Sequence, residues 1–360
     1  MKSITKRGRR RLIVLAALAA FAVLVFVSAN IPAVAETFFA RGVTRGLGYA
    51  LHFVTNYIPI SFYEWTALLL IAGGIALLVG IIILLCKKRW PRLLGWLYRL
   101  GVAVLCVLIA FGLLYSPLYN RAPVISALGL TTTEVTEEKL YAAAEYYVEE
   151  LNAVSAKLSR NEEGNVVPGH SFEELADILN GEFDKQEGDY FAGWEVRPKK
   201  VVMSVPMSYL GITGIYFPFY AEANVNVNIP PSQLGVTMAH EMAHAKGVAV
   251  EGEANIVAYV LCIRSNDDYL RYCGLMRAAA RLLNELPEED FQTLYARLGD
   301  EVKREYRNES AHFAKYEGAI DRISSFFNDL FLKANGVEGG TQSYSATAAS
   351  LVYLYEQISA

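Results

Sequence analysis

The pattern of hydrophobic and polar positions divides the chain into an apolar first third and a longer mixed part. Three apolar runs with few charges lie at about 12–29, 65–85 and 93–115. Each is about as long as a helix that crosses a bilayer. They predict a transmembrane region over residues 1–116. Apolar residues then recur at helical spacing through most of 117–360, which predicts a second, mainly helical domain.

Three short stretches depart from the helical spacing and predict a small β-sheet, so that the expected fold is mainly α with an α+β second domain. They are Val201–Val205, the run from Gly211 to Tyr220, and Ala223–Ile229, which alternates with period two. Pro218 restricts the second stretch to an edge strand or a bulge. An edge strand just before a functional helix would suit an extended peptide, and the alternative is a hairpin that only packs there.

The candidate chemistry lies in the helix expected between Pro231 and Gly247, residues that signal a helix start and stop. It contains His240-Glu-Met-Ala-His244. Residues four apart share one face of a helix, so both imidazoles can bind one zinc ion. Glu241 can then take a proton from a water molecule that the zinc activates. The alternative is a buried helix that happens to carry two histidines, but these side chains would then need other partners.

Two histidines do not complete a catalytic zinc site, which usually has three protein ligands. Glu251 and Glu253 follow just beyond the Gly247 turn, and only one of them is expected to face the metal. We favour Glu251, because Asn255 then lies on the same helix face and can orient a ligand histidine from the second shell. Glu253 remains the alternative.

Charge suggests where the second domain lies. Residues 1–116 hold 13 Lys and Arg against 2 Asp and Glu, whereas the whole chain has a net charge of −4. The N-terminus and the loop Lys87–Arg89 are both basic, so the positive-inside rule places them in the cytoplasm and 117–360 outside it. Residues 12–29 are expected to be an uncleaved anchor. The alternative is a signal peptide cleaved after Ala33-Val-Ala35, which would also place the second domain outside the cytoplasm. No basic cluster interleaved with aromatics suggests nucleic-acid binding.

Two resemblances can be named from these motifs. His240-Glu-x-x-His244 with Glu251-x-x-Ala-Asn255 resembles the gluzincin type of metallopeptidase. The second resemblance rests on five stretches: Gly211-Ile-Thr-Gly-Ile-Tyr-Phe-Pro-Phe, Glu222-Ala-Asn-Val-Asn, the histidine stretch, Glu253-Ala-Asn and Gly340-Thr-Gln-Ser-Tyr344. Together they resemble the DUF3810 family of bacterial membrane proteins. The resemblance implies a zincin-like domain over 117–360 and peptidase activity, with no substrate known.

The expected function is therefore a multi-pass membrane protein that hydrolyses peptides or proteins at the cell envelope with Zn²⁺ as cofactor and Glu241 as general base. A second electrophile should stabilise the oxyanion, and Tyr344 and His312 are the candidates. The alternatives are a zincin-fold sensor or scaffold without hydrolytic activity, and a zinc hydrolase that acts on other substrates.

Overall fold

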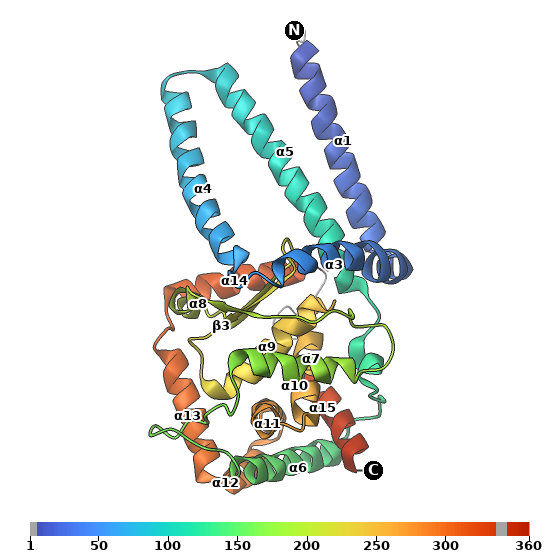
Figure 1. The fold of residues 1–360 in the computed structure, drawn as a ribbon, viewed down its shortest axis with the longest axis vertical. Coiled ribbons are helices and arrows are strands. Elements are labelled where there is room, and N and C mark those ends of the chain that lie inside the picture. The colour runs from blue at the N-terminus through green and yellow to red at the C-terminus, as the bar shows by residue number, and fades with distance from the viewer. Residues whose placement is uncertain (1–5, 336–343, 360) are drawn as a thin grey trace. The chain divides into compact units, whose positions relative to one another are not determined.

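The computed structural model describes residues 6–335 and 344–359 and is mainly helical, with one small mixed sheet (Figure 1). The chain forms two compact units. The first comprises Met1–Thr55, Ile60–Ala122 and Pro218–Ala221; the second comprises Asn56–Pro59, Pro123–Phe217 and Glu222–Ala360. The predicted fold class is thus confirmed.

The first unit contains three helices that are long and apolar enough to cross a membrane: α1 (Lys6–Ala29), α4 (Phe62–Cys86) and α5 (Trp90–Leu114). They contain most of each predicted apolar run. Helix α1 packs against α5, and a Cβ added to Gly112 would lie only 2.8 Å from a methyl of Val25. Between α1 and α4 lie α2 (Pro32–Val34), a π-helical segment η1 (Ala35–Val43) and α3 (Thr44–Thr55); the 3₁₀ turn η2 (Ser116–Asn120) follows α5.

The second unit is built from helices packed around one hydrophobic core. After the 3₁₀ turn η3 (Val124–Leu128), its helices are α6 (Glu137–Ser155), α7 (Phe172–Asp184), α8 (Ser204–Tyr209), α9 (Pro231–Ala245), α10 (Glu251–Arg264), α11 (Asp268–Leu283), α12 (Glu288–Arg297), α13 (Asp300–Ala314), α14 (Ala319–Ala334) and α15 (Tyr344–Ser359).

Helices α9, α10 and α11 form the centre of this core and fix the position of the candidate site. Met238 and Met242 of α9 are fully buried, and burial of a side chain of this size contributes roughly 1.5–3 kcal/mol. Small residues let the helices approach closely. A Cβ added to Gly235 would lie 2.8 Å from Leu270, and one added to Gly274 would lie 2.8 Å from the Cβ of Cys262.

The sheet has the order β1-β3-β2, in which β1 (Lys199–Val201) runs parallel and β2 (Gly214–Phe217) antiparallel to β3 (Glu222–Asn226). In the parallel pair, Lys199 of β1 lies opposite Asn224 of β3. In the antiparallel pair, Gly214 of β2 lies opposite Val225 of β3. Strand β2 is an edge strand that ends just before Pro218, as the sequence predicted. Helix α9 packs against both β2 and β3.

Buried asparagines hold the segment before and within β2 in place. Asn224 and Asn226 are fully buried on β3. The Asn226 amide donates to the carbonyl of Ile212 at 2.9 Å, and the Asn224 amide donates to that of Ile215 at 3.2 Å. Since buried amides need such partners, these bonds satisfy both groups and fasten the strand that faces the site.

Local signals in the sequence located some elements better than others. The capping box Ser171–Glu174 is present at the start of α7, as predicted. The stretch Val201–Val205 was expected to be a strand, but β1 ends at Val201 and α8 begins at Ser204. The hydroxyl of Ser204 donates to the carbonyl of Val201 at 2.6 Å, a local bond that favours a turn over a continued strand.

The close contact of α10 and α11 gives a stability prediction. In Gly274→Ala, the new Cβ would lie about 3 Å or less from Cys262 and from the backbone nitrogen of Ile263. Backbone cannot shift cheaply, so we expect destabilisation by about 1–3 kcal/mol, measured as a lower thermal midpoint by circular dichroism in detergent. The matched control is Gly181→Ala in α7, where a Cβ meets nothing within 4 Å. It should be neutral or stabilising by about 0.5–1 kcal/mol. Equal midpoints for the two variants would contradict the packing described.

Candidate metal centre

The predicted helix is α9, and it brings two imidazoles together. Pro230 caps its N-terminus, and the chain leaves it at Gly247, whose φ of 103° suits glycine. The Nε2 atoms of His240 and His244 are 3.0 Å apart. His244 is buried and His240 is partly exposed, so the pair lies at the edge of the core.

Glu251, the first residue of α10, completes a group of three. Its carboxylate oxygens lie 3.1 Å from Nε2 of His240 and 3.5 Å from Nε2 of His244. One ligand atom from each of the three residues lies within 4.8 Å of the others. In the part of the chain that the structure describes, this is the group of His, Cys, Asp or Glu side chains that could hold a metal ion.

The backbone orients one of these imidazoles. Nδ1 of His244 lies 2.6 Å from the carbonyl oxygen of Val248 in the turn after α9. A proton on Nδ1 can donate to this carbonyl, so that Nε2, once it has lost its own proton, can direct its lone pair toward His240 and Glu251. Asn255, the residue expected to orient a histidine, makes no hydrogen bond to either one among the described residues.

The other candidate residues lie as follows. Glu253 accepts a hydrogen bond from the backbone N–H of Val124 at 3.2 Å, so its carboxylate is directed to a different partner from that of Glu251. Nε2 of His312 lies 3.0 Å from the carbonyl oxygen of Asn228. Tyr344 begins α15, but its side chain is outside the described residues.

Glu241 lies beside this group in a tight, buried environment. Its side chain is 4 % exposed, and Oε2 has no hydrogen-bond partner among the described residues. The backbone of Tyr216 on β2 donates to the carboxylate. Gly214 passes so close that an added Cβ would lie 2.5 Å from Oε1. Sequence reasoning did not assign a role to Gly214 or Tyr216, although both belong to the Gly211-Ile-Thr-Gly-Ile-Tyr motif.

The three charged groups perturb one another. Burial raises the pKa of Glu241 to about 7, while the nearby histidines act in the opposite direction. Burial alone would lower the pKa of His244, but the charge and hydrogen bond of Glu251 raise it to about 9. Burial would raise the pKa of Glu251, yet the charge of His244 and hydrogen bonds from both histidines hold that pKa well below its usual range. Glu251 is therefore deprotonated, as a metal ligand must be.

The donor set and its spacing fit a small divalent ion. Two imidazole nitrogens and one carboxylate are ligands that zinc prefers in catalytic sites. Ligand atoms around tetrahedral zinc lie about 3.4 Å apart, close to the separations of 3.0, 3.1 and 3.5 Å between these side chains. The partnerless Oε2 of Glu241 indicates that a further polar group belongs beside them.

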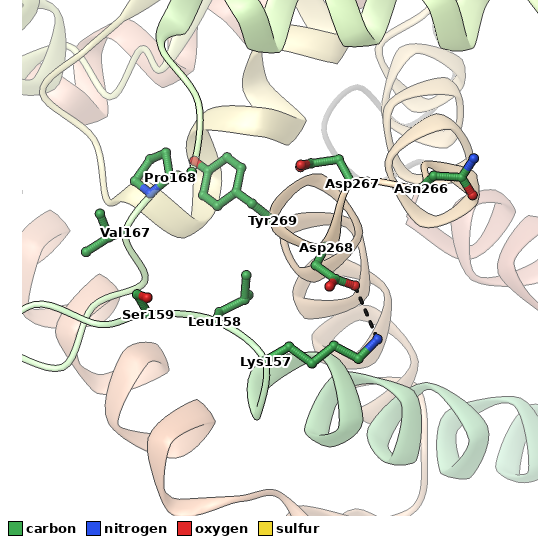
Figure 2. Close-up of a pocket in the computed structure, with 10 residues that line it drawn as sticks. Lys157, Leu158, Ser159, Val167, Pro168, Asn266, Asp267, Asp268 and Tyr269 are labelled. Atoms are coloured by element: carbon green, nitrogen blue, oxygen red, sulfur yellow. Dashed lines mark hydrogen bonds and ion pairs between the residues drawn. The ribbon is translucent and has the colours of Figure 1, made fainter.

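A surface cleft elsewhere in the second unit does not share these residues. It has a volume of about 550 Å³ and lies between the end of α6, the loop around Pro168 and the start of α11 (Figure 2). Its charged side chains already have partners: Lys157 pairs with Asp268 at 3.4 Å, and Asp267 pairs with His170 at 3.0 Å. The His-His-Glu group therefore remains the candidate site.

Fold and site together define a class of protein, in which three helices that can cross a membrane accompany a helical domain with a His-His-Glu group that could hold a metal ion. The chain belongs to the family described as "Protein of unknown function (DUF3810)", which matches residues 39–352. No curated protein and no solved structure matches the chain. The resemblance noted from the motifs is thus confirmed at the level of the family, which assigns no activity.

Proposed function

We propose that this protein is a membrane-anchored zinc metallopeptidase with a zincin-like domain over 117–360. The observation that carries the proposal is the carboxylate of Glu241, which is buried and has one partnerless oxygen directly beside His240, His244 and Glu251. A site that only held a structural metal would have no use for a carboxylate in this position.

The chemistry would be divided between the ion and the chain. Bound zinc would make a water molecule more acidic and polarise the carbonyl group of the substrate. His240, His244 and Glu251 would hold the ion, and the carbonyl of Val248 keeps His244 in the tautomer that this requires. Glu241 would accept the proton of the attacking water and deliver it to the leaving amine. Tyr344 remains the proposed oxyanion donor, and Asn255 remains proposed to orient a ligand histidine when the metal is bound.

The geometry favours a substrate in extended conformation. Strand β2 has β3 on one side and no second strand in the described part of the chain. The N–H of Tyr216 donates to Glu241, so the edge of β2 away from β3 is turned toward the site. An extended peptide that added to this edge would bring its backbone to the general base.

The third ligand can be tested with a matched pair of variants in the full-length protein. Glu251→Ala should weaken zinc binding at least about 100-fold and abolish the appearance of newly cleaved protein termini in membranes that contain the protein. Glu253→Ala should keep both, because Glu253 is directed to Val124. Zinc is measured by elemental mass spectrometry, and termini by proteomics. If Glu253→Ala lost zinc and Glu251→Ala kept it, Glu253 would be the third ligand. If both variants kept zinc, the assignment of Glu251 as third ligand would be refuted.

We also propose that the second unit lies outside the cytoplasm. The basic N-terminus and the basic loop Lys87–Arg89 support this orientation. A cysteine introduced at the exposed Glu187 should react with a membrane-impermeant thiol reagent in intact cells. Reaction only after lysis would place the domain in the cytoplasm instead.

A further inference from the structure

Helix α14 has an unusual distribution of apolar side chains. Ile320, Ile323, Phe326 and Leu330 are spaced by three, three and four residues, so they share one face of the helix. In a helix packed on a soluble protein, such a face is directed toward the core.

In α14 this apolar face is directed outward. The four side chains are 56, 57, 64 and 53 % exposed, respectively. Among the described side chains of α14, the half-buried ones are instead Asp321, Ser324 and Asp329, on the polar side. The preceding helix α13 follows the ordinary rule at Val302, which is fully buried. The described side chains of α14 are therefore arranged in the reverse of the order found in a soluble amphipathic helix.

A neighbouring segment also exposes apolar side chains. Val202, Val205 and Leu210, around α8, are 91, 48 and 37 % exposed. The rings of Tyr209 and Tyr316 are 5.1 Å apart, and a Cβ added to Gly211 would lie 3.9 Å from the Cβ of Asp321. Figure 1 shows α8 beside one end of α14. We call the side of α14 that carries Ile320, Ile323, Phe326 and Leu330 the apolar face.

The chemistry of the apolar face and its attachment point to one partner. Its large residues are aliphatic or aromatic, as in helices that lie in a membrane interface. The chain also carries helices that can cross a membrane, and the last of these ends at Leu114, nine positions before Pro123, where a long segment of the second unit begins. Nine extended residues span at most about 31 Å, so the bilayer is always within reach of the domain.

We propose that the apolar face rests in the interface of the same bilayer that the chain spans, with Ile323 and Leu330 inserted among the lipids. The described charges of α14 are Asp321, Arg322 and Asp329, which nearly balance. Attraction to anionic headgroups is therefore weak, and contact rests on apolar burial. It should persist in zwitterionic lipid and at high salt. This inference does not depend on the chemistry proposed for the metal centre.

The test uses the full-length chain in phosphatidylcholine nanodiscs. The exposed Cys86 and Cys106 are replaced by serine, and the buried Cys262 and Cys273 are kept. Single cysteines at Ile323 or Leu330 carry an environment-sensitive fluorophore, and the same label at Ser325 or Asn328, exposed on the other side of α14, provides the control. Emission wavelength and quenching by lipids with a nitroxide near the headgroup are recorded.

We expect emission at shorter wavelength for labels at Ile323 and Leu330, with quenching at least about three times that at Ser325 and Asn328, unchanged at high salt. Equal quenching at all four positions would overturn the proposal. A shift to shorter wavelength without lipid quenching, which grew with the number of chains per nanodisc, would show that a second copy covers the face and would also overturn it.

Discussion

Glu241→Gln is expected to abolish cleavage while zinc content stays at the wild-type level. Glutamine has nearly the same shape and fits beside Gly214 and Tyr216, but it cannot accept a proton from water. Loss of general-base catalysis should reduce the rate by about 10²–10⁴-fold. The ligand atoms of His240, His244 and Glu251 are untouched by this change. Newly formed protein termini in membranes and zinc per chain are the two measurements.

The exposed Glu187→Gln, which makes the same chemical change far from any ligand in sequence, is the control and should leave both quantities unchanged. Termini that appear equally with wild type and Glu241→Gln would remove the general-base role. If neither wild type nor Glu241→Gln produced new termini, and both supported cell growth equally well, the sensor or scaffold alternative would be favoured. If Glu241→Gln lost only the hydrolysis of non-peptide substrates, the alternative of a zinc hydrolase that acts on other substrates would be favoured.

Gly214→Ala should also inactivate the protein without removing zinc. The new Cβ would lie 2.5 Å from Oε1 and 2.8 Å from Cδ of Glu241, so the carboxylate must move. A displacement of about 1 Å in a reacting group can reduce the rate by about 100-fold. The candidate ligand atoms come from α9 and α10, and the three atoms nearest to the added Cβ all belong to Glu241. Zinc per chain should therefore stay near wild type.

Gly193→Ala is the matched control, because a Cβ at this position meets nothing within 4 Å. It should keep both zinc and cleavage. Gly214→Ala with full activity would show that the close approach of β2 does not position Glu241. Gly214→Ala without zinc would show that this strand also supports the metal-binding helices, and would remove the separation between binding and chemistry.

Much of the fold could be predicted because strong local signals mark it. The three apolar runs are about as long as a helix that crosses a bilayer, and each lies largely within a helix of the first unit. Pro231 and Gly247 bracket the helix that carries the histidines, and α9 begins and ends close to them. Helical periodicity then fixes that both imidazoles share a face, with no tertiary information needed.

Other features depend on contacts between distant residues, which periodicity does not encode. The short strand ending at Val201 could not be separated from α8, because β-branched residues occur in both. The surroundings of Glu241 come from β2, some 25 residues earlier in the chain. The choice between Glu251 and Glu253 depends on where the 3₁₀ turn at Val124 lies. Val248 contacts His244 through its backbone carbonyl, which any residue provides, so its side chain gives no signal.

The position of the three candidate metal ligands in the sequence has a consequence for folding. His240, His244 and Glu251 lie within twelve consecutive residues, so bringing them together closes a short loop at little entropic cost. The metal group can therefore assemble early, from one helical hairpin. Gly214 and Tyr216 must arrive later, through longer-range pairing of the sheet. Under the proposed function, a nascent chain would hold its ion before Glu241 is positioned, and would remain inactive until the sheet has formed.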